Sequence, residues 1–349
     1  MTLDQCRAID PGGMYDLIRA FPDQIREAVR IGRQAPLRLP RRGLSNILLC
    51  GMGGSAIGGD LLRSLCADEL GVPMLVNRSY RIPAWVGRGT LLIASSYSGN
   101  TEETLEAARL ATARGARMLA ITSGGRLAQL AARRRAPVVA IPGGLPPRAA
   151  LAYSFFPLLL SLIRLELLRP RDAQIRETIT LLQTLGERYA APEQTENTAV
   201  ALARLLEQRI GIIYSGTELM DAVNTRWRGQ MAENAKTLVF GNLLPEMNHN
   251  EIVGWKALSE PMRAMQVLLL RDREDHRRVA RRIEVTRELL SSHTDRIREV
   301  RSQGRSRLAR VFSLVHLGDW VSYYLAVLHG EDPMPVRAID HLKAELERP

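Results

Sequence analysis

Two segments rich in glycine and hydroxyl residues have the composition of phosphate-binding loops. The segment CGMGGSAIGGD (50–60) follows the apolar run Ile47-Leu48-Leu49, and SSYSGNTEET (95–104) follows the apolar segment TLLIA (90–94). Backbone N–H groups and hydroxyls at the beginning of a helix bind a phosphate dianion through oriented dipoles, without a lysine. A helix cap needs one hydroxyl, whereas the second segment offers Ser95, Ser96, Ser98 and Thr101. Phosphate binding is therefore a better interpretation of the two segments than helix capping.

The first segment also satisfies the dinucleotide-binding pattern G-x-G-x-x-G/A, from Gly51 to Ala56. Such a site carries an acidic residue about 20 positions further along, which holds a ribose hydroxyl. The next strand-like segment ends instead in Asn77-Arg78, so NAD is disfavoured and Arg78 leaves only an NADP site as an alternative. No Gly-Lys-Ser/Thr follows the glycines, which excludes a P-loop. The loops alone leave open which molecule carries the phosphate.

The composition is typical of a well-packed globular protein with room for two domains. The chain has 349 residues, of which 46% are hydrophobic. Its three cysteines (Cys6, Cys50 and Cys66) have no metal-ligand spacing, which indicates a reducing compartment without structural disulfides. The N-terminus has no apolar signal segment. The longest apolar stretch (149–163) is too short to span a bilayer and predicts a buried helix. We therefore expect a cytoplasmic protein without a membrane partner.

The formal net charge of +11 raises the question of a nucleic-acid partner. Much of the positive charge lies in arginine clusters such as ARRRA (132–136) and RDREDHRRVARR (271–282). These two clusters lie on expected helices, among acids or alanines, and contain no aromatic residues that could stack on bases. We interpret them as solvated helix faces and expect no nucleic-acid partner. The basic balance also favours an anionic small substrate.

Short apolar strands alternate with helices from residue 45 onward, and the pattern then repeats. The expected strands lie at 46–51, 73–77, 90–96, 117–122 and 137–142. Helices between such strands predict βαβ units and a parallel sheet covered on both faces. A strand, a small-residue loop and a long helix return at 209–236, with further apolar segments at 266–272 and 312–320. We therefore predict an α/β protein with two tandem doubly wound domains, at 1–165 and 196–349, joined by a helical linker region at 166–195.

Five motifs together resemble those of the bifunctional phosphoglucose/phosphomannose isomerases of archaea and bacteria. They are GMGGSAIGGD (51–60), SSYSGNTEET (95–104), RWRGQMAENAK (226–236), NHNEIVGW (248–255) and DPMPVRAIDHLK (332–343). The resemblance covers the chain from about residue 14 to its C-terminus. It implies two sugar isomerase (SIS) domains with parallel sheets flanked by helices, a hexose 6-phosphate as substrate, and a homodimer.

By this resemblance the reaction interconverts glucose 6-phosphate and mannose 6-phosphate with fructose 6-phosphate. A proton moves between C2 and C1 through a cis-enediol(ate), which requires a carboxylate base, a group that opens the sugar ring, and positive charge near the developing oxyanion. Glu233 matches the family's Q-x-x-E-N pattern and is our candidate base, next to Met231 and Ala232, which lower the local polarity. The alternative for Glu233 is an exposed helical glutamate paired with Lys236 or Arg228.

The resemblance assigns the remaining parts of the site. His249 would open the ring, because an imidazole can donate and accept protons near neutral pH, and a second copy of the chain would supply it across the dimer interface. Arg148 would neutralise the enediolate oxygen, and Lys343 would contact the sugar or assist ring opening. The phosphate would be held by Gly54, Ser55, Ser96, Ser98 and Thr101. The reaction needs no metal and the six histidines show no ligand spacing, so we expect neither a metal nor a cofactor.

Two other functions remain as alternatives. Another SIS isomerase, acting on a pentose or heptose phosphate, would have a single domain, which conflicts with the repeated halves. A non-catalytic phosphosugar-binding regulator would use the positive charge to bind DNA, but residues 1–45 are too short and too interrupted by prolines for a helix-turn-helix. The presence of both Glu233 and His249 also argues against a silent site. Some members of the family carry a hydroxyl residue near the position of Lys343, and none is evident here, which leaves the sugar preference open.

Overall fold

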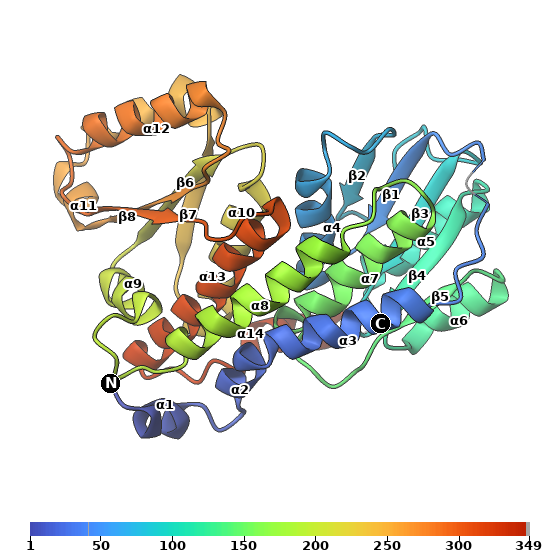
Figure 1. Cartoon of the computed structure of the whole chain (residues 1–349), viewed down its shortest axis with the longest axis horizontal. Helices are drawn as coiled ribbons and strands as arrows, with labels where there is room; N and C mark the ends of the chain where they lie inside the picture. The colour runs from blue at the N-terminus through green and yellow to red at the C-terminus, as the bar shows by residue number, and fades with distance from the viewer. Residues whose placement is uncertain (41, 347–349) are drawn as a thin grey trace. The chain divides into compact units, whose positions relative to one another are not determined.

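The computed structural model describes residues 1–40 and 42–346, which form two compact units, each built on its own sheet (Figure 1). The first-sheet unit comprises Ala20–Thr180 and Ser306–Leu308. The second-sheet unit comprises Met1–Arg19, Leu181–Arg305 and the chain from Ala309 onward. The expected α/β class, with two parallel sheets flanked by helices, is confirmed. The domain limits drawn from the sequence stay a prediction.

The first sheet has five parallel strands in the order β2-β1-β3-β4-β5. The strands are β1 (Asn46–Cys50), β2 (Met74–Asn77), β3 (Thr90–Ser95), β4 (Arg117–Thr122) and β5 (Val138–Ala140). Each lies within two residues of the bounds expected from the sequence. β3 is buried along its whole length, as is typical of a parallel strand with helices on both faces of the sheet.

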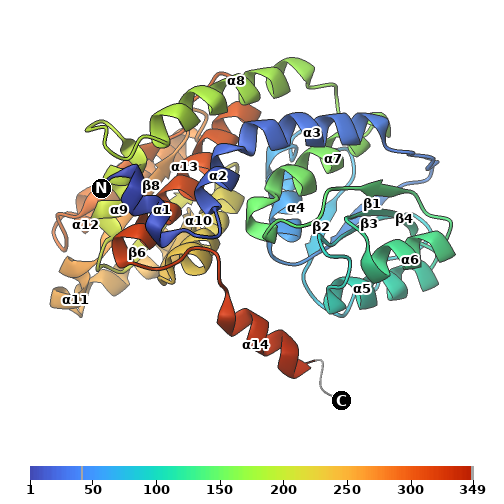
Figure 2. The same cartoon turned by 90° about the horizontal axis from the view of Figure 1, so that it is seen from below.

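Helices cover both faces of the first sheet. α5 (Glu102–Ala113) and α6 (Gly125–Arg133) lie on one face, where Ala107 and Leu127 join the buried cluster that includes Leu92 of β3. α3 (Phe21–Gln34), α4 (Gly53–Leu65) and α7 (Leu151–Arg164) lie on the other face (Figure 2). The buried helix expected at 149–163 is α7, in which every residue from Leu151 to Leu162 is buried.

The second sheet has four parallel strands in the order β7-β6-β8-β9. They are β6 (Gly211–Gly216), β7 (Val239–Leu244), β8 (Gln266–Arg271) and β9 (Ile297–Arg301). Counted along the chain, the second strand lies at the edge and is followed by the first, third and fourth, as in the first sheet. The internal repeat expected from the sequence is therefore present in the strand order. β7 and β9 were not predicted from the sequence.

The helices of the second-sheet unit include α10 (Asp221–Ala235), α12 (Arg277–Leu290) and most of α13 (Arg307–His329). The apolar segment 312–320 lies within α13. α13 is long and apolar enough to cross a membrane, but 94% of its apolar window is buried inside the protein, as in the core helix of a globular fold. The helices of the described chain that have not yet been named, from either unit, are α1 (Leu3–Ile9), α2 (Met14–Arg19), α8 (Asp172–Tyr189), α9 (Thr198–Leu206), α11 (Ser259–Ala264), α14 (Arg337–Leu346) and the 3-10 helices η1 (Pro147–Ala149), η2 (Glu246–His249) and η3 (Glu251–Lys256).

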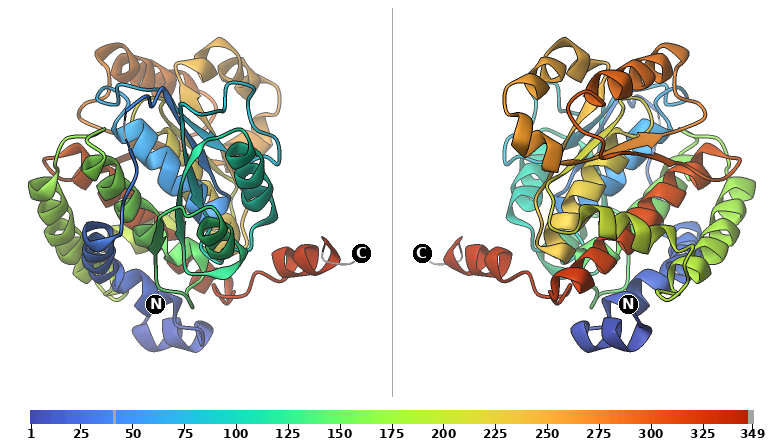
Figure 3. Two further views of the ribbon diagram at one scale, coloured as in Figure 1. Left: turned by 90° about the vertical axis from the view of Figure 1, so that its right-hand side faces the viewer. Right: turned by 90° about the vertical axis from the view of Figure 1, so that its left-hand side faces the viewer.

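None of the described residues of α14 is buried. It extends away from α13 in two perpendicular views (Figures 2 and 3). Its apolar residues Ile339 and Leu342 are 40% and 58% exposed. The C-terminal lysine of the predicted site, Lys343, therefore lies on an exposed helix.

Candidate active site

The strand order places the two glycine- and hydroxyl-rich loops next to each other. β1 and β3 are neighbours in register, with Cys50 beside Ala94, and each loop follows the carboxyl end of one of these strands. The chain continues from β1 to one edge of the sheet and from β3 toward the other. The carboxyl ends of the strands at such a reversal are where doubly wound proteins bind ligands. Both predicted phosphate loops lie at this position.

In the first loop, glycines allow other backbone segments to approach the beginning of α4. Gly53, the first residue of α4, has a positive φ of 47°. A Cβ on Gly51 would lie 3.0 Å from the carbonyl oxygen of Ser95, and a Cβ on Gly54 would lie 2.7 Å from the carbonyl oxygen of Pro147. Glycine is therefore required at position 54, which the resemblance assigned to the phosphate. Ser55, in the first turn of α4, is 7% exposed.

In the second loop, the hydroxyls bond to the loop rather than to the helix that follows. Thr101 is the N-cap residue of α5, but its Oγ1 lies 2.8 Å from the Oγ of Ser96, and it makes no side-chain cap bond. The backbone N–H of Gly99 donates to Ser96 Oγ (3.1 Å), and the N–H of Asn100 donates to Ser98 Oγ (3.2 Å). Gly99 has a φ of +72°, which favours glycine. Capping therefore does not explain why this loop carries so many hydroxyls.

Arg148 is held against both loops by its neighbours in sequence. It lies in η1 and is 4% exposed. The carbonyl of Pro147 touches the beginning of α4 at Gly54, and the N–H of Leu145 donates to the hydroxyl of Tyr97 in the second loop (3.0 Å). The structure therefore places Arg148 and all five residues predicted to hold the phosphate near the carboxyl ends of the strands of the first sheet.

A polar network fixes the helix that carries Glu233. On one side of α10, Arg226 forms a buried ion pair with Asp319 of α13 at 2.8 Å, and Gln230 donates to the same carboxylate at 2.8 Å. One turn further on, the side-chain amide of Asn234 donates to Ser322 (2.9 Å). Burial raises the pKa of Asp319, although Arg226 opposes this rise. Breaking such a buried pair costs roughly 3–5 kcal/mol, so the network fixes the rotation of α10 about its axis.

Glu233 lies in the last turn of α10 and is half-buried. It lines a pocket of about 540 Å³ together with Lys236, Glu331, Asp332 and Arg337. Pockets of 300–1,000 Å³ are typical of small-ligand sites, so this one has room for a hexose. Leu238, Val336 and Ile339 add apolar walls.

His249 and Lys343 lie on exposed segments. His249 ends η2, where its neighbours are held by hydrogen bonds: Asn248 donates to Thr286 Oγ1 (2.9 Å), and Asn250 Oδ1 accepts from the N–H of Glu251 (2.6 Å). Lys343 lies on α14, beyond the first turn that contributes Arg337 to the pocket of Glu233. The structure of a single chain thus places Glu233 in a pocket and leaves these two residues exposed.

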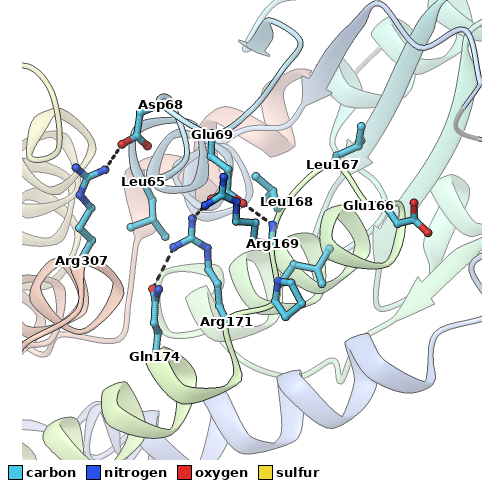
Figure 4. Close-up of a pocket in the computed structure, with 12 residues that line it drawn as sticks. Leu65, Asp68, Glu69, Glu166, Leu167, Leu168, Arg169, Arg171, Gln174 and Arg307 are labelled. Atoms are coloured by element: carbon cyan, nitrogen blue, oxygen red, sulfur yellow. Dashed lines mark hydrogen bonds and ion pairs between the residues drawn. The ribbon is translucent and has the colours of Figure 1, made fainter.

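A larger pocket, of about 780 Å³, lies at the other end of α4 (Figure 4). α4 has 13 residues and is therefore about 20 Å long, which separates this pocket from the two loops. Two of the three arginines that line it are paired: Arg171 forms an ion pair with Glu69, and Arg307 lies 2.6 Å from Asp68. These carboxylates neutralise the guanidinium groups, so size alone does not make this pocket the phosphate site.

Sequence reasoning missed several residues around Glu233. From the sequence, Lys236 was considered only as an ion-pair partner of the Glu233 side chain. In the structure its ammonium donates to the backbone carbonyl of Glu233 (2.8 Å). Arg337 was not considered, and the contacts of Arg226 and Asp319 join segments 93 residues apart. The spacing of Arg226, Gln230 and Asn234 by four residues was a usable signal, because it places three polar side chains on one helix face.

Among residues 1–40 and 42–346, no three His, Cys, Asp or Glu side chains gather in a way that could hold a metal ion. Cys6, Cys50 and Cys66 are all buried and free. The expectation that the reaction proceeds without a metal stays a prediction.

The strand order, the two loops and the repeated half define a class of protein, the sugar-phosphate isomerase fold with two SIS domains. The SIS domain family matches residues 42–137, and the family described as bacterial phospho-glucose isomerase C-terminal SIS domain matches residues 195–346. A crystal structure of a hypothetical protein from Thermus thermophilus superposes with a TM-score of 0.74 and 17% identity, covering 99% of this chain and 93% of that one. At that identity the likeness supports the fold alone.

Similar sequences define the family more narrowly. A bifunctional phosphoglucose/phosphomannose isomerase from Caldicellulosiruptor bescii is 44% identical over 335 residues, which cover 95% of this chain and 98% of that protein. Another, from Thermoplasma acidophilum, is 36% identical over 302 residues, which cover 86% and 90%. The chain belongs to the bifunctional phosphoglucose/phosphomannose isomerase family. The predicted family and its two SIS domains are confirmed.

Proposed function

We propose that this chain interconverts glucose 6-phosphate and mannose 6-phosphate with fructose 6-phosphate through a cis-enediol(ate), with Glu233 as the base. Membership of the family supports the reaction. The observation that carries the choice of base is that Glu233 lines a pocket large enough for a hexose, on a helix locked by the Arg226–Asp319 network. The reaction only redistributes protons within the substrate and requires no cofactor.

In this proposal the first-sheet unit binds the phosphate and supplies a cation. Ser55, Ser96, Ser98 and Thr101 offer hydroxyls, and the first turns of α4 and α5 offer N–H groups and the positive ends of their dipoles. Gly54 lets the segment that carries Arg148 approach this edge. The guanidinium of Arg148 then neutralises the oxyanion of the enediolate, a charge that exists only after the proton has left carbon.

Glu233, His249 and Lys343 carry out the proton transfers. His249, supplied by a second copy of the chain, donates a proton to the ring oxygen while a second group takes the proton of the anomeric hydroxyl, and Lys343 contacts the sugar and assists the opening. Glu233 then takes the proton from C2 of the open aldose and returns it to C1, while the C1 oxygen gains a proton and the C2 hydroxyl loses one, which gives the ketose. Rotation of the enediol about C2–C3 presents the other face of C2 to Glu233, so that mannose 6-phosphate forms as well as glucose 6-phosphate.

The proposal is tested by following both products from fructose 6-phosphate, with EDTA present, in the wild type and in Glu233→Gln. We expect both aldoses from the wild type and roughly a 10²–10⁴-fold loss of kcat in the variant, the usual contribution of a general base. Glu288→Gln, at an exposed glutamate of α12, is the matched control and should keep its activity. Glucose 6-phosphate alone would indicate a monofunctional isomerase, and no turnover would favour a phosphosugar-binding regulator.

A mixing experiment tests the exchange of His249 between two copies. Glu233→Gln and His249→Ala should each be inactive, but subunits dissociated, mixed in equal amounts and reassembled should recover about a quarter of the wild-type activity. Half of the dimers are then mixed, and each mixed dimer holds one site with both native residues. Mixtures that stay inactive would show that Glu233 and His249 act within one chain.

A further inference from the structure

Lys236, directly after the helix of Glu233, has a backbone conformation that side chains rarely adopt. α10 ends at Ala235, and Lys236 follows with φ 55° and ψ 29°, in the left-handed region. The residue at this position after a helix is usually glycine, because a Cβ is strained there. Lys236 also lines the pocket of Glu233, and backbone strain kept at such a place is a reason to ask what the side chain does.

The side chain of Lys236 gathers three carbonyl oxygens. Its Nζ donates to the carbonyls of Glu233 (2.8 Å), Asn234 (3.3 Å) and Pro333 (3.5 Å). An ammonium group has three N–H donors, so these carbonyls can use all of them. The first two belong to the last turn of α10, where a cation also complements the helix dipole. The third belongs to the segment that leads into α14.

Other contacts close the rest of this helix end. The Thr237 hydroxyl donates to the carbonyl of Ala235 (3.0 Å), and His329 lies 3.3 Å from the same carbonyl. On the opposite side of the helix, Asn234 is bonded to Ser322. These contacts involve neither the carbonyls of Glu233 and Asn234 nor the Pro333 segment, which are the groups that Lys236 binds.

We propose that Lys236 is a positioning residue for Glu233. Its ammonium links the backbone carbonyl of Glu233 to that of Pro333. This link fixes the backbone position of Glu233 and therefore the position of its carboxylate in the pocket. A glycine at position 236 would relieve the backbone strain and lose this fastening, so stability and activity should change in opposite directions. The assignment rests on the proposed role of Glu233.

The test compares Lys236→Gly with a control at the same kind of backbone position. Gln208 follows α9 in the same unit and also has a φ of 55°. Gln208→Gly should raise the Tm and leave kcat and KM unchanged. Lys236→Gly should keep or raise the Tm, lower kcat by about 10–100-fold, the effect of displacing a reacting group by up to 1 Å, and leave KM within about threefold, because the residues proposed to hold the phosphate are intact. Lys236→Arg should recover most of the lost kcat.

The outcomes separate this proposal from the proposed function. Turnover by the wild type tests the isomerase, and the ratio of Lys236→Gly to wild type tests the positioning role. A kcat for Lys236→Gly within twofold of wild type would overturn the proposal. So would a loss of kcat that follows a fall in Tm, or a Lys236→Arg variant no better than the glycine variant.

Discussion

Replacing Gly54 by alanine tests whether the close approach of η1 to α4 sets the position of Arg148. A Cβ at position 54 would lie 2.7 Å from the carbonyl oxygen of Pro147 and 3.3 Å from its carbon. Ordinary van der Waals contact begins near 3.4 Å, so the Pro147 carbonyl must move by about 0.7 Å. Arg148 is the next residue, and its backbone moves with that carbonyl.

The magnitude follows from this displacement. A misplacement of about 1 Å can cost 10²-fold in rate, so a shift of about 0.7 Å predicts a 10–100-fold lower kcat/KM. This equals about 1.4–2.8 kcal/mol of transition-state stabilisation. Overpacking should also cost about 1–3 kcal/mol of folding stability.

Steady-state kinetics with fructose 6-phosphate and thermal unfolding measure both effects. Gly71→Ala is the matched control, because a Cβ there meets nothing within 4 Å. It should leave kcat/KM and Tm close to wild type. A Gly54→Ala enzyme with wild-type kcat/KM and wild-type Tm would refute the reasoning, because it would mean that η1 yields without moving Arg148.

Two further predictions concern buried titratable groups. Burial raises the pKa of the Cys6 thiol to about 11, of Cys50 to about 12 and of Cys66 to about 11, so we expect all three to react with a thiol reagent only after denaturation, and fast reaction of the native protein would contradict this. Burial also lowers the pKa of His316 to about 3, from 6.5 in the unfolded chain. The unfolded state therefore binds the proton first as the pH falls, and this group should remove up to about 1.4 kcal/mol of stability per pH unit between pH 6.5 and 3. Urea unfolding at pH 7 and pH 5 should show a smaller loss in His316→Gln than in the wild type, and equal losses would contradict the assignment.

The parts of the fold that could be predicted from the sequence are those with a local apolar pattern. β1, β3 and β4 are short apolar runs before glycine or hydroxyl residues, and the structure places them where expected. β9 was not predicted because three of its five residues are charged, so it lacks an apolar pattern; charged residues are common in strands at a sheet edge. β7 is also an edge strand, and Gly241 interrupts its apolar pattern. The assignment of residues 1–19 to the second-sheet unit depends on contacts far apart in the chain, which no local pattern contains.

The candidate site divides in the same way. The position of the two candidate phosphate loops could be predicted, because glycine and hydroxyl residues after an apolar run are a local signal. The approach of Pro147 to Gly54 joins segments 93 residues apart, and the sequence shows only two prolines before an arginine. The role proposed for Lys236 depends on its left-handed backbone conformation. A lysine in the sequence does not predict such a conformation, because non-glycine residues rarely adopt a positive φ. Sequence patterns therefore located the chemical groups, while the restraints on their positions came from tertiary contacts.

The repeated strand order raises the question of whether the second sheet also binds a phosphate. At the positions that correspond to the two loops, the chain after β6 carries Glu218, and the chain after β8 carries Asp272 and Asp275. These aspartates accept backbone N–H groups themselves: Asp275 from Asp272 (3.0 Å), and Asp272 from Glu274 (2.8 Å). A phosphate dianion there would meet carboxylates, whereas at the loops after β1 and β3 it would meet hydroxyls.

We therefore expect one hexose 6-phosphate per chain. Calorimetric titration of Glu233→Gln with fructose 6-phosphate measures the stoichiometry without turnover, and a second binding event per chain would contradict the argument. A stoichiometry of one would mean that the repeated strand order does not bring a repeated phosphate site, because the loops after β6 and β8 carry carboxylates where those after β1 and β3 carry hydroxyls.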